Sequence, residues 1–478
     1  KSQEAGSSLT KSVLVCLEYK LVTYNRRIGS DMIKKWAVPV VGIASATATG
    51  LVHASATPGA QDAAAAPPAL EALVAEALEK SAELRALEER IRAAEASVAP
   101  AGALPDPTAS VVISNVPVGG MELDRTPMSG VELGLSQGVP AGRKRWLRRE
   151  VRREEVELLM ARYEDRRSNV IRKVKRAYYD LQYLDGALVI AEENKGLAED
   201  LLATAEARYA TGRGLQQDVF RAQVRLSRMI DALVALRGKR AAAAARLNRL
   251  LYRPPEQAVP KLAALARTTV ALKAHELARE AEARNPRLRE AVKRVEQSAT
   301  KRHLAAAGIR PDLNLGLRYR IREDVPMDPV RGTDFWSASA GVTLPWVYRR
   351  DKVDQEVKAA EAQQQAAEQD LKALRNEILS RVEELTIEIE RAEEQIALVE
   401  TGLLPQAEGA LASSRAAYAT GQVEFLTLLD NQMNLYNLEL HRLALIADRE
   451  RNLAELDYLV GGALAPASAD SEVKPSVE

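Results

Sequence analysis

The sequence has 478 residues, enough for two or three ordinary domains, and a net charge of +1 from 67 Lys and Arg against 66 Asp and Glu. Because the opposite charges are interleaved, this balance excludes a general polyanion-binding surface. Aromatic residues are only 4% and alanine is abundant, a composition typical of long packed helices rather than of a compact aromatic core.

The first 69 residues are expected to lie outside the folded part of the chain. Residues 1–31 precede a methionine and are interpreted as an upstream extension that is not native. Residues 32–56 have the features of a secretory signal peptide, namely a basic start, an apolar run and a small-residue cleavage pattern ending at Ala56. A transmembrane anchor is the alternative, but the run is short and rich in small residues. Residues 57–69 are interpreted as an Ala/Pro linker.

The single cysteine, Cys16, lies in the upstream extension. A mature chain without it can form no disulfide, no thiolate metal site and no nucleophilic thiol. Beyond the signal peptide, no apolar run reaches the ~20 residues that a membrane helix needs. The sequence therefore predicts no membrane-spanning helix in the mature chain.

Four segments alternate between apolar and polar residues with a period of two, which predicts β-strands. The clearest runs from Leu313 to Arg322, where every odd position is apolar or aromatic and every even position is polar, charged or glycine. At ~3.3 Å per residue, about nine such residues span ~30 Å, the reach of a tilted strand across an outer membrane. The strands are expected at about 107–116, 129–139, 312–322 and 335–344.

A half-buried sheet in a soluble domain is the alternative interpretation of this alternation, and aromatic residues argue against it. Tyr319, Trp336, Trp346 and Tyr348 lie toward strand ends. Transmembrane strands carry girdles of aromatic residues at those positions. The pattern therefore favours strands that cross a membrane.

Three arginines indicate water on the other face of the third strand. Arg318, Arg320 and Arg322 alternate with its apolar residues, and we expect them to face a watery lumen because a packed interior disfavours unpaired charges. Four strands cannot close a barrel, and an open sheet in lipid leaves two unpaired edges. Several copies of the chain must then share one barrel. Two copies would give about eight strands, and three would give about twelve and leave room for a pore.

Two long helices are predicted from apolar residues spaced by three and four. One runs from Arg143 to about Tyr209 and the other from Tyr348 to about Glu400, with no proline until Pro405. Roughly 65 residues at 1.5 Å each give a rod of ~100 Å. A filamentous coiled coil is the alternative for the helices alone, but strand pairs do not belong in a filament.

A tight turn follows each rod. Gly212 and Gly421 stand where glycine supplies the left-handed cap that ends a helix, and each follows a tyrosine by three residues, Tyr209 or Tyr418. A shorter amphipathic helix then runs back. Each unit is therefore predicted to be a helical hairpin whose turn marks the far tip.

The order helix, strand pair, long helix, turn and helix occurs twice. The six residues Ala207–Gly212, Ala-Arg-Tyr-Ala-Thr-Gly, return as Ala416–Gly421, Ala-Ala-Tyr-Ala-Thr-Gly, and two further anchors repeat in the same order roughly 205 to 209 residues apart. The predicted repeats are residues 70–260 and 261–462, followed by a disordered tail at 463–478. The predicted fold class is mainly α with a small β part.

This organisation resembles the TolC family of outer-membrane efflux proteins from about Leu70 to Gly461. The residues from Leu403 to Asp430 are similar to the family's most recognisable stretch, and segments 104–107 and 136–144 resemble its heavy-metal branch, the CzcC- and CusC-like proteins. The resemblance implies a homotrimer in the bacterial outer membrane. In it, an α-helical barrel in the periplasm joins a twelve-stranded transmembrane β-barrel, with four strands per protomer.

The implied partners are a periplasmic adaptor (membrane fusion) protein, an inner-membrane pump of the resistance-nodulation-division (RND) type and outer-membrane lipids. The resemblance also implies a gate at the tip, in which Asp218 and Tyr418 latch the hairpins and a ring of Asp430 narrows the entrance and attracts cations. The family's basic partner is Val423 here, so the closing network must differ, and Arg213 is a candidate substitute. The alternative is that the two aspartates are ordinary first-turn residues favoured by the helix dipole.

No site of another kind emerges. The basic cluster from Arg143 to Arg149 follows a strand and is interpreted as side chains that reach lipid phosphates, rather than as a nucleic-acid site. The histidines lack metal-ligand spacing, and no catalytic set or cofactor fingerprint is present. We therefore expect no enzyme, no cofactor and no dedicated metal site.

Three functions stay open at this point. The first is a passive exit duct for heavy-metal cations, with its energy supplied by the pump. The second is the same duct serving drugs or secreted polypeptides, and the third is a periplasmic coiled-coil scaffold without a pore. The sequence does not identify the substrate, because selectivity in such machines resides largely in the pump.

Overall fold

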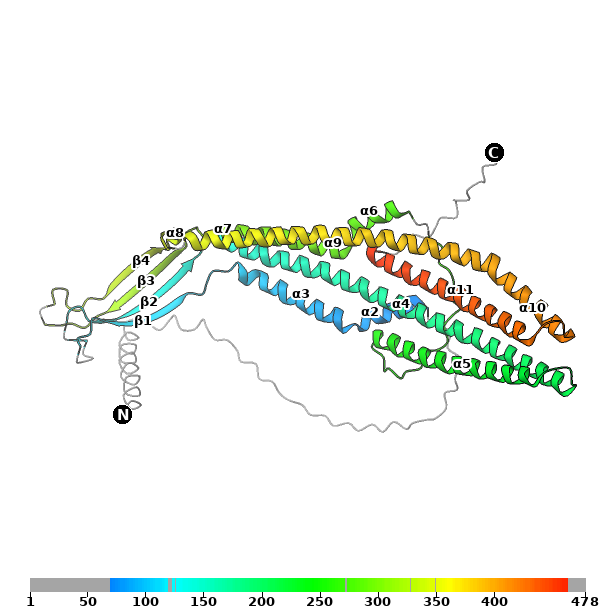
Figure 1. The fold of residues 1–478 in the computed structure, drawn as a ribbon. Coiled ribbons are helices and arrows are strands. Elements are labelled where there is room, and N and C mark those ends of the chain that lie inside the picture. Colours follow the sequence, from blue (N-terminus) through cyan, green and yellow to red (C-terminus); the bar gives the residue numbers. More distant parts are fainter. Residues whose placement is uncertain are drawn as a thin grey trace, which may run out of the picture. The chain divides into compact units, whose positions relative to one another are not determined.

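The computed structural model describes residues 69–118, 123–124, 126–270, 273–326, 328–348 and 350–462. The predicted extension, signal peptide and tail, and the linker up to residue 68, lie outside the described residues. The rest is mostly helical with one small sheet (Figure 1). The helices in chain order are α2 (Leu70–Lys80), α3 (Ala82–Ala101), α4 (Gly142–Ala210), α5 (Gln216–Leu250), α6 (Ala274–Arg284), α7 (Pro286–Ala307), α8 (Pro345–Tyr348), α9 (Arg350–Leu398), α10 (Leu404–Thr420) and α11 (Phe425–Val460).

The first rod is α4, whose 69 residues match the predicted span within one residue at each end. At 1.5 Å per residue it is roughly 100 Å long. Its buried positions, among them Val174, Leu181 and Leu201, recur at helical spacing along the whole length. The rod is therefore held by packing along its side rather than by a compact core.

The second rod reaches the turn predicted at Gly421, although its apolar spacing was followed only to about Glu400. It continues from α9 through a single π-helical turn, Val399–Leu403, into α10. Pro405 has no N–H to donate and its ring would clash with the carbonyl four residues earlier in a regular α-helix. The wider π turn just before this proline changes the hydrogen-bonding register, so the rod passes the proline and ends at Thr420.

The four strands form one antiparallel sheet in the order β1 (Thr108–Ser114), β2 (Gly130–Val139), β3 (Leu313–Ile321) and β4 (Phe335–Val342). Each strand is one to three residues shorter than predicted at one end or at both. The central strands β2 and β3 come from different halves of the chain and pair along their length. β1 and β4 are the free edges of this sheet.

One face of the sheet is apolar and exposed. The register places Val111, Leu133, Tyr319 and Trp336 in one row across it, and opposite residues share a face. Trp336 is 69% exposed and Val111 is 59% exposed. The apolar half of the alternation therefore covers no core within the described chain.

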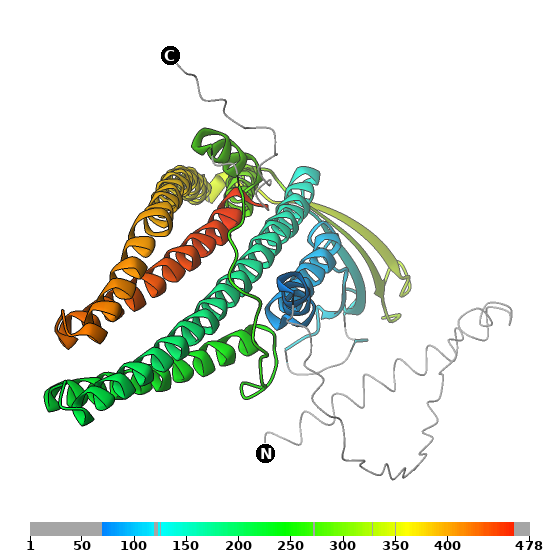
Figure 2. The same cartoon turned by 90° about the vertical axis from the view of Figure 1, so that its right-hand side faces the viewer.

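The helices pack around α4 in several small cores. Figures 1 and 2 show α4–α5 and α10–α11 as two neighbouring hairpins with their turns at the same end, away from the sheet. Ion pairs reinforce the seam between α4 and α11, including Arg172–Glu455, Lys175–Asp457 and Arg451–Asp180, each 2.5 Å long. The two halves of the chain thus meet along a continuous interface.

The connection between the halves is tied down by buried polar groups. Asp185, 5% exposed, accepts from Arg240 Nε at 2.5 Å and from the Leu262 backbone N–H at 2.9 Å. Glu450, 1% exposed, accepts from both the backbone N–H and the hydroxyl of Thr268. The non-helical segment after α5 therefore has fixed partners on α4, α5 and α11.

None of the helices in the described ranges combines the length and the apolar character that crossing a membrane requires.

Candidate functional site at the hairpin tips

Both hairpin turns use a left-handed glycine. Gly212 has φ +69° and Gly421 has φ +81°, a region that side chains with a Cβ avoid. The residue after each glycine donates its backbone N–H five residues back, Arg213 to Arg208 O and Gln422 to Ala417 O, both at 2.9 Å. This bond satisfies a helix-end carbonyl, so the repeated Tyr-Ala-Thr-Gly sequence builds the same cap twice.

The two hairpins share one core at the tip. Tyr418 of α10 and Phe425 and Leu428 of α11 pack with Leu201 of α4 and Ala222 of α5. The rings of Tyr418 and Phe425 lie 5.1 Å apart, and both residues are less than 5% exposed. All four tip helices therefore contribute to a single cluster.

Arg208, near the end of α4, covers Tyr418. Its guanidinium lies 4.6 Å from the centre of the Tyr418 ring and donates to the Tyr418 carbonyl. The same group donates to the carbonyl of Arg213 at 3.2 Å. A cation over an aromatic face is attracted by the ring's quadrupole, so Arg208 clamps the first hairpin onto the second.

This geometry changes the expected roles of the basic residues. Arg213, the candidate substitute for the family's basic partner, offers only its carbonyl to the clamp, and Arg208 supplies the charge. The role of Arg208 was not predicted from the sequence. The available signal was the difference between the two copies of the turn, which have Arg208 in one and Ala417 in the other.

Tyr418 and Asp218 are both buried at this clamp, at 4% and 8% exposure. Burial, and then the negative charge of Asp218, raise the pKa of the Tyr418 phenol. Its hydroxyl has no hydrogen-bond partner among the described residues. The phenol therefore stays neutral at ordinary pH and keeps an unused donor in the electrostatic field of Asp218.

Asp430 and Tyr209 lie outside the clamp. Asp430 is exposed on α11 and lines a groove of about 490 Å³ that it shares with Arg221, Arg225 and Arg228 of α5. Tyr209 is 47% exposed, although its repeat counterpart Tyr418 is buried. The structure thus brings together Asp218 and Tyr418 but leaves Asp430 in a separate, arginine-rich setting.

The predicted lumen arginines separate into two kinds. Arg318 and Arg320 lie on the face opposite the apolar rows, where Arg318 is exposed and Arg320 forms an ion pair with Glu132 on the neighbouring strand. Arg322 follows the last residue of β3 and is 7% exposed. Arg322 thus corrects the expectation of three solvated arginines, because it is buried and paired.

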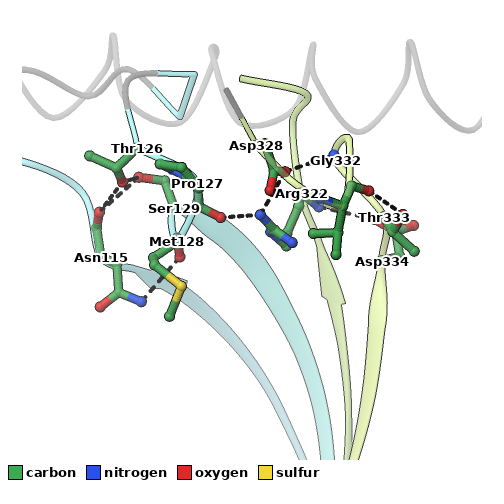
Figure 3. Close-up of polar contacts among 11 residues, drawn as sticks. Asn115, Thr126, Pro127, Met128, Ser129, Arg322, Asp328, Gly332, Thr333 and Asp334 are labelled. Carbon is green, nitrogen blue, oxygen red and sulfur yellow. Dashed lines mark hydrogen bonds and ion pairs between the residues drawn. The ribbon is translucent and has the colours of Figure 1, made fainter. Parts of the chain in front are cut away.

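Arg322 ties the two strand-connecting loops together (Figure 3). It donates to the Pro127 carbonyl in the first loop and to Asp328 Oδ2 in the second at 2.8 Å. Asp328 also accepts from the backbone N–H groups of Val330 and Gly332. Alternation alone could not reveal this pairing, because the partner lies in an irregular loop.

The basic cluster at the start of α4 is also divided. Lys144 is 6% exposed and binds Asp312 Oδ1 at 2.8 Å and the Arg310 carbonyl at 2.6 Å. It therefore joins α4 to the start of β3 and does not reach toward lipid. Arg143, Arg148 and Arg149 are exposed, as is Trp146 beside them.

In the part of the chain that the structure describes, no group of three or more His, Cys, Asp or Glu side chains is placed to hold a metal ion.

Comparison with known protein families identifies the scaffold. The outer membrane efflux protein family matches residues 73–251 and 277–462, which is most of the chain. The chain belongs to this family. A comparison with curated proteins finds no significant match.

Solved structures show the same fold at low sequence identity. The outer-membrane channel OprN is 20% identical with a TM-score of 0.71, over 82% of this chain and 90% of that one. The outer membrane protein VceC of Vibrio cholerae is 18% identical with a TM-score of 0.69, over 82% and 96%. CusC, described for its transmembrane channel formation, is 18% identical with a TM-score of 0.69, over 82% and 92%.

Proposed function

We propose that this chain is a passive outer-membrane exit duct of a tripartite efflux system and works as a homotrimer. One observation carries the proposal. The sheet has an exposed apolar face and two free edges, β1 and β4, in a chain of the outer membrane efflux protein family. An open sheet edge in lipid leaves backbone groups unpaired at several kcal/mol each. Pairing β1 of one copy with β4 of the next removes that cost.

Three copies would close twelve strands into one barrel, with Arg318 and Arg320 toward a watery lumen. The helices would continue as a second barrel into the periplasm, with the hairpin tips at the entrance. There the duct would meet a periplasmic adaptor and an RND-type pump in the inner membrane. The pump supplies the energy, so the duct is not an enzyme and needs no cofactor.

The contact of Arg208 with Tyr418 at the tip could act as the latch of a gate. Arg208 holds the two hairpins together through Tyr418, and the free hydroxyl of Tyr418 lies in the field of Asp218. Movement of one hairpin against the other would break the contact of the guanidinium with the ring and with the carbonyl. We propose that Arg208, Asp218 and Tyr418 hold the entrance closed.

The cargo in this proposal is heavy-metal cations, on the basis of the segments 104–107 and 136–144 that resemble the heavy-metal branch. The three arginines that share the groove with Asp430 oppose the attraction of cations there, so this cargo is proposed from the two segments alone. A second candidate cargo, amphiphilic organic compounds, is favoured by the three arginines that share the groove with Asp430.

Single-channel recording tests the duct and the gate together. The full chain in planar bilayers should form rare, small openings, and Arg208→Ala or Tyr418→Ala should increase the open fraction. Arg249→Ala, an exposed arginine of α5 outside the clamp, is the matched control. Absence of any conductance contradicts the duct, whereas unchanged openings in the clamp variants contradict only the gate. Growth of a deletion strain on metals and on amphiphilic antibiotics separates the two cargo classes.

A further inference from the structure

The groove between α5 and α11 contains three arginines that have no carboxylate partner in the described part of the chain. Arg221, Arg225 and Arg228 are spaced by four and three residues, so they lie on one face of α5, and Asp430 faces them from α11. Within the described ranges, no carboxylate lies within the 4.0 Å ion-pair distance of any of the three guanidinium groups. The groove therefore carries a net charge of about +2 from four ionised groups.

Arg225 differs from the other two arginines because its guanidinium is buried. It is 6% exposed, and its Nε and Nη2 atoms are buried without a hydrogen-bond partner among the residues that the structure describes. Among the described residues, its one hydrogen-bond acceptor is the sulfur of Met433, which lies 3.2 Å from Nη1. A thioether is a weak acceptor, so a buried guanidinium is left almost unsatisfied. Burial also lowers the pKa of Arg225, which an anion would reverse.

Exposed apolar side chains line the groove and could contact the apolar part of a ligand. Phe220 is 56% exposed, Val224 is 53% exposed and Leu426 is 43% exposed, all lining the same space. Met433 has three flexible torsions and can turn away from Arg225 without disturbing the backbone. An anionic head would then replace the sulfur as the acceptor, and charge-assisted hydrogen bonds are about twice as strong as neutral ones.

We propose that this groove binds amphiphilic organic anions. The head, a carboxylate, sulfonate or phosphate, lies on Arg225 between Arg221 and Arg228, and the apolar body lies against Phe220 and Val224. Asp430 rejects ligands with a second negative charge on its side of the groove. The inference rests on the proposed duct only in placing the groove at the entrance, where such a compound would bind before it passes or would block the current.

Binding of anilinonaphthalene sulfonate, an aromatic anion that fluoresces in apolar surroundings, tests the proposal. The full chain in lipid nanodiscs is titrated, with empty nanodiscs as the blank. Phenylnaphthylamine, which has the same rings without the sulfonate, is the neutral comparison. Arg225→Met should weaken sulfonate binding about tenfold, the loss expected for a charge-assisted hydrogen bond, and leave amine binding within about twofold.

Two further variants keep the test decisive if Arg225→Met does not fold. Arg221→Gln with Arg228→Gln changes only exposed side chains and should weaken the sulfonate about fivefold, again without effect on the amine. Arg249→Gln, exposed on the same helix outside the groove, should bind like the unchanged chain. Equal binding of sulfonate and amine, or sulfonate binding unaffected in both arginine variants, overturns the proposal. The proposal is also overturned if the unchanged chain does not bind the sulfonate and Arg225→Met dissociates the trimer. In that case Arg225 contacts a second copy of the chain, which fills the groove in place of an anion.

Bilayer recording separates this inference from the duct. The sulfonate added to the tip side should reduce the current of the unchanged chain and not that of Arg221→Gln with Arg228→Gln. Normal channels that the sulfonate does not block, with no binding in nanodiscs, refute the groove alone. Binding in nanodiscs without any channel refutes the duct and leaves the groove standing.

Discussion

Replacement of Arg208 by glutamine should lower the free energy that is needed to open the hairpin tip. The variant loses the charge-assisted donation to the Tyr418 carbonyl, worth about 1.5–3 kcal/mol, and the cation–ring contact, worth about 0.5–1 kcal/mol at a partly exposed site. Because glutamine and water replace part of both, we expect a net loss of about 2 kcal/mol in the free energy of opening, or roughly 30-fold.

Amide hydrogen exchange of the full chain measures this loss directly. The amides of Gly421 and Gln422 are bonded to Tyr418 O and Ala417 O, and they exchange only when the turn opens. Peptides that cover residues 416–424 should exchange about 30-fold faster in Arg208→Gln, while peptides from the middle of α4 should not change.

Arg415→Gln is the matched control for this experiment. Arg415 is also an arginine of the tip, but its side chain is 55% exposed and its nearest carboxylate, on Asp200, is 3.7 Å away. Such a pair contributes at most about 0.5 kcal/mol. A change of less than threefold in Arg208→Gln, or equal acceleration in both variants, refutes the role of Arg208 as the clamp.

Three further changes test other parts of the account. Gly421→Ala should lower the free energy of unfolding by about 1–2 kcal/mol, because it adds a Cβ to a left-handed residue beside Arg208. Gly409→Ala, in open space inside α10, should raise the free energy of unfolding by up to about 1 kcal/mol. The urea midpoints of the two variants must therefore shift in opposite directions. Tyr418→Phe should keep the tip within about 0.5 kcal/mol at neutral pH, since the hydroxyl has no partner among the described residues. Because the folded pKa of Tyr418 is raised, its contribution is fully present below the ordinary value of 10.0 and is lost as pH rises through the raised value. The protection factors of the tip amides, which correct for the base catalysis of exchange itself, should therefore fall in alkali in the unchanged chain and not in Tyr418→Phe. Asp185→Ala should destabilise the chain by about 3 kcal/mol, because it leaves Arg240 without its buried partner. The Asp448 side chain is 61% exposed, so Asp448→Ala should cost under about 0.5 kcal/mol. Similar urea midpoints for the two variants would contradict the role of the buried pair.

The sequence predicts the repetitive parts of this fold well, because repetition is where local pattern and tertiary packing agree. The spacing of apolar residues located α4 within one residue at each end, and period-two alternation located all four strands. Both patterns are set by the geometry of helix and strand, so they can be read without knowing the partner. The left-handed glycines follow from the same local chemistry.

The parts that the sequence did not predict depend on distant partners. Arg208 binds a carbonyl 210 positions away, and Arg322 binds an aspartate in an irregular loop. The π turn before Pro405 shifts the register of the apolar residues, so their regular spacing follows the rod only to about Glu400. Asp218 and Asp430 could not be distinguished by spacing, yet one is buried at the clamp and the other faces arginines across a groove.

The central claim is that the free edges of the four-stranded sheet are joined by other copies of the same chain. The mass of the full chain extracted from outer membranes, measured by native mass spectrometry in detergent, tests it most directly. We predict an assembly of three copies that requires detergent or lipid to stay in solution. A chain that is a single copy and stays soluble without detergent would contradict the account.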